Sequence, residues 1–206
     1  MKKTIIVAFL CFLGITQVNA QSKFRPGIRG GANFAHLTQT DNPNEKYSTR
    51  TDFYIGAFGA LNLSKVYTLQ PEINYTRQGA KYEYIDVDNR RYNSEIKVSY
   101  LSLGVANKFK FDKFNIHLGP TLDIKVKDAG KKLGTAYNDG YYYNNDYYYN
   151  DDLTAIDFAF FLGAGFDITK NFGIEARIKK GIIPVNDNGD WDSTNVVFQT
   201  GITYTF

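Results

Sequence analysis

Side chains able to do acid–base or nucleophilic chemistry are scarce in this sequence. Its 206 residues include 2 histidines and 1 cysteine. No serine and aspartate stand in a pattern that would make His36 part of a catalytic triad, and His117 falls on the polar side of a predicted strand, where a satisfied hydrogen-bonding role is expected. No glycine-rich phosphate loop, zinc-ligand spacing or nucleophile elbow is present. The sequence therefore predicts no catalytic residues, no cofactor and no enzymatic activity.

Two polar segments could instead bind a ligand. Residues 187–192 cluster oxygen ligands suited to Ca²⁺, but they lack the spacing and closing glutamate of a calcium-binding loop, so no metal site is predicted. Residues 141–152 are a low-complexity run in which Tyr and Asn dominate, and these types make adaptable contact surfaces in antibody loops. We expect this run to contact a sugar or a protein, with a loop that only packs on itself as the alternative. The candidate contact residues are Tyr141, Tyr142, Tyr143, Tyr147, Tyr148 and Tyr149.

The first residues have the pattern of an export signal. Two lysines precede a nearly uninterrupted apolar stretch over residues 4–15, and small or short side chains at 18–20 match a signal-peptidase site. The stretch is too short to span a bilayer as a helix, and no later apolar run approaches that length. We therefore predict a cleaved signal peptide, residues 1–20, and an exported single domain, residues 21–206.

The composition favours an all-β protein. The chain holds 16 Tyr, 16 Phe and 18 Gly but only 5 Pro. Aromatic residues favour strands, and glycines in strands mark bends and close approaches. The net charge of +3 is weak and the signs are mixed. Because nucleic acid would demand a concentrated basic patch, no nucleic-acid partner is expected.

Alternation of apolar and polar residues predicts eight strands. In the clearest one, Leu69, Ile73 and Tyr75 point to one face and Glu72 to the other. Proline cannot donate to a strand ladder, so we expect a bulge or an irregular pairing at each proline in a strand, Pro71 and Pro120. The predicted strands cover residues 24–34, 53–63, 67–78, 98–111, 115–126, 156–168, 172–179 and 195–204.

Short and long connections alternate between these strands. Tight turns are predicted at 64–65, 112–113 and 169–171, and every other connection is long and polar. A soluble sandwich has no reason to place all its long loops at one end. A transmembrane barrel has short periplasmic turns, long extracellular loops and an even number of strands. The fold class expected is therefore an all-β, eight-stranded, antiparallel, up-and-down transmembrane barrel.

The polar faces of the strands carry charges of both signs. An eight-stranded barrel has an interior that side chains just fill, so charges that point inward must be paired. We predict a structural ion-pair network in the lumen centred on Arg29, Glu72, Glu175 and Arg177. The alternative is that these are solvated surface charges of a soluble barrel.

Aromatic side chains concentrate near the predicted strand ends, where membrane barrels carry interfacial girdles. The last strand places Ile202, Tyr204 and Phe206 at alternate positions, which resembles the signal that the outer-membrane assembly machinery recognises in its clients. The expected girdle residues are Phe24, Tyr54, Tyr67, Tyr82, Tyr84, Tyr100, Phe109, Phe111, Phe114, Phe166, Phe172 and Tyr204.

Several segments resemble a known family, the small outer membrane protein β-barrel domain or PorT-like family. The segment 69–80 is the most specific of these. The resemblance covers essentially the whole mature chain and implies an eight-stranded outer-membrane barrel without catalytic residues. The matching segments are 27–34, 69–80, 118–120, 157–158, 163–165 and the closing Phe206.

The leading hypothesis is a non-enzymatic barrel of the outer membrane that serves envelope structure or surface interaction through its extracellular loops. Its expected partners are outer-membrane lipid and lipopolysaccharide, the assembly machinery and an unidentified surface ligand. The alternatives are a soluble periplasmic lipocalin-like carrier, an accessory barrel of a protein-secretion system, and a barrel enzyme using one of the histidines.

Overall fold

The computed structural model describes residues 24–38, 43–85, 87, 89, 91–128, 134–138, 141–145, 153–185 and 193–206. The predicted signal peptide, the acidic segment 187–192 and half of the tyrosine candidates, Tyr147–Tyr149, lie outside these ranges. Within them, no helix is long and apolar enough to span a membrane. The strands are β1 (Phe24–Leu37), β2 (Glu45–Asn62), β3 (Tyr67–Ile85), β4 (Arg91–Phe111), β5 (Phe114–Asp128), β6 (Gly134–Asn138), β7 (Tyr141–Asn145), β8 (Ile156–Asp167), β9 (Phe172–Gly181) and β10 (Asn195–Thr205).

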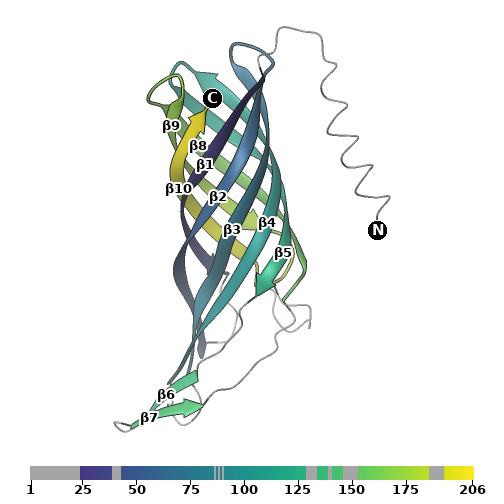
Figure 1. Cartoon of the computed structure of the whole chain (residues 1–206). Helices are drawn as coiled ribbons and strands as arrows, with labels where there is room; N and C mark the ends of the chain where they lie inside the picture. The colour runs from purple at the N-terminus through teal and green to yellow at the C-terminus, as the bar shows by residue number, and fades with distance from the viewer. Residues whose placement is uncertain are drawn as a thin grey trace.

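Eight of these strands close into a ring. Neighbours follow the order β3-β2-β1-β10-β9-β8-β5-β4, and a pairing of β3 with β4 completes the circle. Every pairing is antiparallel. Figure 1 shows the resulting tilted barrel, with the β6–β7 hairpin beyond one end. The predicted eight-stranded, up-and-down architecture is confirmed.

The three predicted tight turns connect β2 to β3, β4 to β5, and β8 to β9. In two of them a hydroxyl oxygen organises the backbone: Ser64 Oγ accepts from the Tyr67 amide at 3.0 Å, and Thr169 Oγ accepts from the Phe172 amide at 2.9 Å. Asp112 adopts a φ of 56°, as its tight turn requires. β1 starts beside the end of β2, where Phe24 pairs with Leu61. The C-terminus lies at this same end (Figure 1), which identifies it as the periplasmic end.

Neither proline produces a bulge. The β2–β3 ladder passes from the Phe58–Glu72 pair to the Leu61–Leu69 pair without a change of register. Between these pairs, Pro71 has no paired residue on β2. The β4–β5 ladder likewise skips Pro120 between Gly104–Thr121 and Asn107–Leu118. Each proline therefore interrupts one ladder and leaves its alignment intact, so the expectation of a bulge is wrong and that of an irregular pairing is confirmed.

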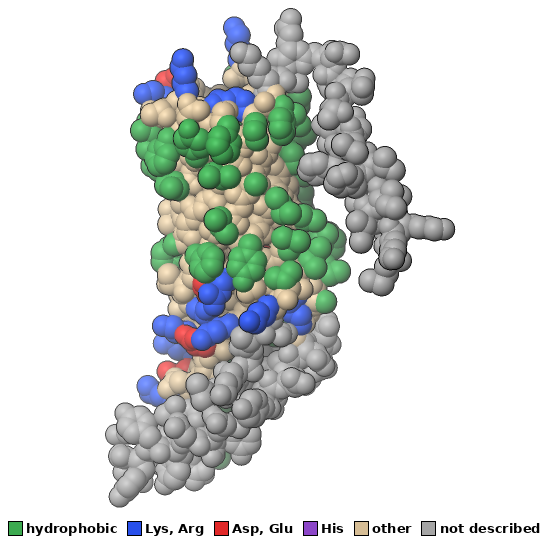
Figure 2. Space-filling model, viewed as in Figure 1, with side chains coloured by type: hydrophobic (Ala, Val, Ile, Leu, Met, Phe, Trp, Pro, Cys, Tyr) green, Lys and Arg blue, Asp and Glu red, His purple; other side chains and the backbone are tan. Residues whose placement is uncertain are grey.

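Burial alternates along most of the barrel strands, with polar side chains inside. On β3, Gln70, Glu72 and Asn74 are buried, whereas Ile73 and Tyr75 face outward and are 46% and 36% exposed. Strand β9, on another side of the ring, follows the same rule: Ile174 and Ile178 face outward at 47% and 52% exposure. Hydrophobic side chains gather on the outer surface near both ends of the barrel (Figure 2). This arrangement suits lipid outside and is the inverse of a soluble carrier with an apolar lumen.

Three neighbouring strands run far beyond the length that a membrane requires. A transmembrane strand needs about 9–11 residues, which β9 and β10 match with 10 and 11 residues. The strands β2, β3 and β4 have 18, 19 and 21 residues. The predicted ends of these strands, at residues 53, 78 and 98, are therefore wrong by several residues each. We call the part beyond the barrel the outer sheet: residues 45–50 of β2, 79–85 of β3 and 91–97 of β4, continued by β6 and β7.

The outer end of the barrel has an apolar interior. Tyr100 and Val98 continue the inward row of β4 and are 2% and 3% exposed, and they belong to one buried hydrophobic cluster. The barrel strands and outer loops contribute the other members. We call this set the outer core: Leu37, Tyr47, Ala80, Ile96, Val98, Tyr100, Leu153 and Val185, with Tyr82 packed against it.

Part of the predicted aromatic girdle is misplaced. Tyr54 and Tyr100 point inward and are each 2% exposed, and Tyr82 packs on the outer core. Tyr84 continues the same inward row as Tyr82, beyond the barrel. Large aromatic side chains suit a lumen or a protein core as well as an interface, so residue type alone could not separate these cases. The expected girdle residues that do face outward with at least 41% exposure are Phe24, Phe109, Phe111, Phe114, Phe166 and Tyr204, all near the periplasmic end.

Candidate functional site

Four charged side chains from three strands meet in the middle of the lumen. Arg29 of β1 donates to Glu72 of β3 at 2.6 Å and also pairs with Glu175 of β9. Arg177 of β9 holds the same Glu72 through both terminal nitrogens, at 2.8 and 2.9 Å, and reaches Glu175 at 3.2 Å. The structure thus brings together the four residues that the sequence predicted as a group.

The four charges are almost completely sealed from solvent. Their side chains are 1% exposed for Arg29 and Glu72, 2% for Arg177 and 3% for Glu175. Neutral groups supplement the ion pairs: Gln70 Nε2 donates to Glu72 at 2.8 Å, and the Tyr54 hydroxyl bonds Glu175 at 3.2 Å. Since each carboxylate accepts from several donors, the charges compensate one another through protein groups.

Ring faces complete the cluster. The guanidinium carbon of Arg29 lies 4.9 Å from the centre of the Tyr54 ring, and that of Arg177 lies 4.6 Å from the centre of the Phe161 ring. Both distances are within cation–π range. The inward position of Tyr54 therefore has a physical role in the lumen.

A second ion pair lies nearer the outer end. Lys179 pairs with Asp123, which also accepts from Gln78 Nε2 at 3.4 Å. Lys179 and Asp123 are 4% and 1% exposed as side chains. The prediction centred the network on four other residues and missed this pair as a unit, although both members fall on the predicted inward positions. Pairing them requires the barrel's strand order, which alternation does not supply.

Amide and hydroxyl side chains fill the space between the two ion-pair groups. Gln199 Nε2 donates to Asn33 Oδ1 at 2.8 Å, and Asn33 Nδ2 donates to Thr76 Oγ1 at 2.8 Å. The cavity that Arg29, Glu72 and Lys179 line here has a volume of about 10 Å³. That is close to the least space that a single water molecule occupies, so the lumen is closed at this level.

The two histidines lie at opposite ends of the barrel, where His36 pairs with Val196 and His117 pairs with Lys108. His117 is fully buried near the periplasmic end, with Nδ1 3.0 Å from Asn115 Oδ1. Its Nε2 atom has no hydrogen-bond partner, so the expected satisfied role holds for one ring nitrogen only. His36 is half-buried on the outward side of β1 at the outer rim. In the described part of the chain, no group of three His, Cys, Asp or Glu side chains is placed to hold a metal ion.

A family model places this barrel among known proteins. The model described as outer membrane protein beta-barrel domain matches residues 17–187. The chain belongs to this family. Together with the apolar outer surface and the closed ring, the match establishes an outer-membrane β-barrel protein located in the bacterial outer membrane.

Solved structures of outer-membrane proteins are similar to this chain at low sequence identity, and the fold is shared with the first of them. Neisserial surface protein A matches with a TM-score of 0.52 and 12% identity, covering 88% of this chain and 97% of that one. Ail of Yersinia pestis matches with a TM-score of 0.48 and 12% identity, covering 88% and 98%. OprG of Pseudomonas aeruginosa gives 0.43 and 11%, covering 90% and 97%. No curated protein matches the chain.

The tyrosine-rich segment of the outer-membrane barrel contributes β7, the second strand of the β6–β7 hairpin. Residues 91–93 of β4 pair with β6, so the hairpin widens the outer sheet. β6 and β7 pair with each other from Gly134–Asn145 to Asn138–Tyr141. Of the six candidate contact residues, Tyr141, Tyr142 and Tyr143 lie on β7, and the other three lie outside the described residues. The predicted loop is therefore a strand over Tyr141–Asn145, and the sequence does not reveal it because a run of one residue type hides the alternation of a strand.

Proposed function

We propose that this outer-membrane barrel is a non-enzymatic surface-interaction protein whose contact surface is the outer sheet with its tyrosine-rich hairpin. The observation that carries the proposal is the length of β2, β3 and β4, which continue for several residues beyond the barrel. A barrel that served only as a membrane anchor would not need strands that extend beyond the bilayer.

The lumen supports the same proposal. A closed, charge-paired interior leaves no passage for a solute, so a transport role is not favoured. The outer sheet by contrast presents a polar face. Lys46 and Lys81 are exposed on neighbouring strands of it, and Lys97 is half-exposed beside Glu95. A rigid sheet that carries polar and aromatic groups above the membrane suits recognition of a sugar or a protein.

Two finer assignments belong to this proposal. The PorT-like subtype is supported by the segment 69–80, which resembles that family over most of β3. The assembly machinery is proposed as a partner during folding, because β10 presents Ile202 and Tyr204 outward in an alternating row that Phe206 continues, at 52%, 42% and 62% exposure. Lipid and lipopolysaccharide are the proposed environment of the outward face.

Deletion of the hairpin tests the contact surface. Residues 134–150 are replaced by a short Gly–Ser linker, and in a matched control residues 186–192, from another long connection, are replaced in the same way. Both variants should keep the heat-modifiable gel mobility of a folded barrel, because neither replacement removes a residue of the eight ring strands. Barrels in fluorescent phospholipid nanodiscs are then applied to an array of surface glycans and extracellular-matrix proteins.

The proposal predicts that the wild type and the control bind the same array members and that the hairpin deletion binds none of them. Unchanged binding by the hairpin deletion, or no binding by the wild type to any array member, contradicts the proposal.

A further inference from the structure

Four cations gather on the outward face of the barrel at its outer rim. Arg77 and Lys81 lie on β3, Lys97 on β4 and Lys127 on β5; we call them the rim cations. Register places them side by side: Arg77 pairs with Ser99, and Ser99 pairs with Lys127 on its other side. Directly paired residues of adjacent strands share a face, so Arg77 and Lys127 flank Ser99.

Gly79 leaves open space beside Lys97, another of the rim cations. It pairs with Lys97 and lies between Arg77 and Lys81 on β3. Its φ of +133° suits glycine, and a Cβ atom there would collide with the Ile96 carbonyl oxygen. Since no side chain stands opposite Lys97, this lysine and the two cations of β3 share one open patch of surface.

The nearby carboxylates do not neutralise the patch. Glu95 pairs with Lys97 at 2.7 Å, and Asp52 lies 3.4 Å from Arg77 Nε while also pairing with the buried Arg50. Glu83, two residues beyond Lys81 on the same face, lies 3.7 Å from the Arg91 Nε atom. With Arg50 and Arg91 included, six cations therefore face three carboxylates. The side chains of Arg77 and Lys97 are 37% and 42% exposed, so both remain accessible to an anionic group from outside.

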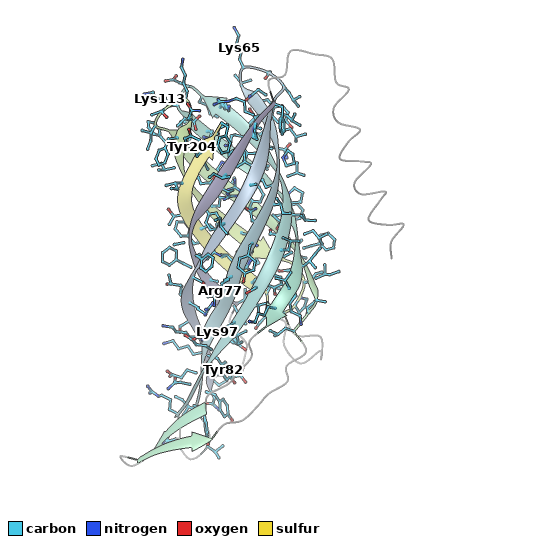
Figure 3. All side chains as sticks on the ribbon, in the orientation of Figure 1. Lys65, Arg77, Tyr82, Lys97, Lys113 and Tyr204 are labelled. Carbon is cyan, nitrogen blue, oxygen red and sulfur yellow. The ribbon has the colours of Figure 1, made fainter. Side chains whose placement is uncertain are left out.

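An apolar surface begins directly below the rim cations. Tyr75 is two residues from Arg77 on the same face of β3, and its hydroxyl bonds Ser99 Oγ at 3.0 Å. Leu103 follows on β4 at 39% exposure, and Phe53 of β2 packs its ring 5.5 Å from the Arg77 guanidinium. Basic side chains lie just beyond a belt of hydrophobic ones in Figure 2, and Figure 3 places Arg77 and Lys97 at that level.

Polar space continues outward from the rim cations. A groove of about 490 Å³ on the outer sheet is lined by Lys81 and Lys97 together with Ser48, Asn93 and Glu95. Hydroxyl, amide and carboxylate groups of this kind suit hydroxyl-rich sugars. From the membrane outward, the surface therefore offers apolar side chains, then cations, then polar groups.

We propose that the rim cations bind the phosphates of lipid A, the glycolipid anchor of lipopolysaccharide, from the side. A phosphorylated glycolipid has acyl chains, phosphates and sugars in the same order as the three zones of this surface. A bound molecule would rest its chains on Tyr75 and Leu103 and its phosphates among Arg77, Lys97 and Lys127. Soluble polyanions are a weaker match, because the cations lie at the edge of the lipid surface rather than on the extracellular tip.

A triple variant, Arg77→Ser with Lys97→Ser and Lys127→Ser, tests this site. The matched control removes three cations from the periplasmic turns: Lys65→Ser, Lys113→Ser and Lys170→Ser. Fluorescent lipopolysaccharide is titrated into each purified barrel in detergent, after heat-modifiable mobility has shown that the barrel is folded. Basic side chains near an anionic surface each contribute roughly fivefold in affinity, so the triple variant should bind about 100-fold more weakly. The control should bind like the wild type.

Three further measurements test whether binding depends on the lipid A phosphates and on the charge of the rim cations. Lipid A without its phosphates should bind the wild type as weakly as intact lipopolysaccharide binds the triple variant. Replacing the two lysines by arginine, Lys97→Arg with Lys127→Arg, should preserve binding, because charge is kept. Wild-type affinity in the triple variant overturns the proposal. So does displacement of lipopolysaccharide by a heparin-derived oligosaccharide at a lower concentration than lipid A requires, since that result would assign the patch to soluble polyanions.

Discussion

The barrel and the outer sheet are built from the same strands with opposite polarity. Along β4, the inward row contains Ser102, Gly104 and Ala106 within the barrel, Val98 at its outer end and Ile96 beyond it. The outward row changes in the reverse sense, from apolar side chains over the membrane to polar ones above it. The pleat is continuous, so only the surroundings differ: lipid outside the barrel and water outside the outer sheet.

Irregular backbone marks the boundary between these two regions. The β2–β3 ladder shifts its register between Thr49 and Tyr54, and the β4–β5 ladder shifts between Ser99 and Tyr100. Gly79, with its positive φ, lies on β3 at the same level. Bulges increase the local twist of a strand. The boundary is therefore where three strands leave the curvature of the ring and become a sheet.

The barrel and the outer sheet also differ in how their charged side chains are held. Within the barrel, Glu72 is sealed and held by two arginines, whereas in the outer sheet Glu95 is paired with one exposed lysine. Burial makes a charge costly when its partner is lost, and exposure to water removes most of that cost. The lumen should therefore depend strongly on its ion pairs and the outer sheet only weakly.

Replacing the central carboxylate should have the largest effect. Glu72→Ala leaves Arg29 and Arg177 sharing only Glu175, and breaking a buried pair costs about 3–5 kcal/mol of unfolding free energy. Urea unfolding in detergent, followed by loss of the faster gel mobility, measures it. The matched variant is Glu95→Ala, which should change the free energy by less than about 1 kcal/mol. Equal effects of the two variants would show that the lumen charges are hydrated.

A cation introduced on the outward face should destabilise the protein where that face contacts lipid and have little effect where it contacts water. Val105 is 38% exposed on the outward face of β4 and pairs with Pro71 in the middle of the barrel. Val105→Arg should cost about 2–4 kcal/mol in a bilayer, since it forces a charge into hydrocarbon. Asn93→Arg, on the same face of the same strand but in the outer sheet, should be nearly neutral. Unfolding from phospholipid vesicles measures both, and a tolerated Val105→Arg contradicts the membrane level assigned to this strand.

A polar side chain in the outer core should weaken the outer sheet alone. Val98 is 3% exposed inside this cluster, so Val98→Asn loses apolar burial and adds an amide without a partner, a local cost of about 2 kcal/mol. Amide hydrogen exchange should accelerate in residues 79–85 and 91–97, while exchange in β9 and β10 stays slow. Lys97→Asn is the exposed control. Uniform acceleration over the whole barrel would show that the two regions unfold as one unit.

The sequence predicted the barrel well because period two and connection length report directly on strands and turns. The inward positions of Arg29, Glu72 and Arg177 follow from the alternation of inward and outward side chains along each strand. The outer sheet was missed, because alternation continues through Tyr84 and Tyr92 with polar and apolar faces exchanged, and the segment then resembles a polar loop. Tyr54 and Tyr100 were misplaced for a related reason: an aromatic side chain is equally at home at an interface, in a protein core and beside an arginine.

The Lys179–Asp123 pair and the rim cations are brought together by the order and register of the strands, which the sequence does not reveal. Lys179 meets Asp123 only because β9, β8 and β5 are consecutive in the ring. The rim cations likewise come from three strands, and their positions along the chain, from 77 to 127, give no sign of proximity. Spatial clusters of this kind follow from the strand pairings rather than from a motif.

The exposed pair of the outer sheet should show the smallest effect and a definite pH dependence. The Lys97 ammonium donates to Glu95 and lowers the pKa of that carboxyl below its ordinary value. A carboxyl with a lowered folded pKa stabilises the protein above its unfolded pKa, and this contribution is lost as the pH falls through the folded pKa. Glu95→Gln should therefore differ from the wild type by at most about 0.5 kcal/mol near neutral pH and coincide with it at about pH 3. A double-mutant cycle with Lys97→Met, measured by hydrogen exchange of the outer sheet without lipopolysaccharide, isolates the pair, and a difference that grew on acidification would contradict the assigned sign.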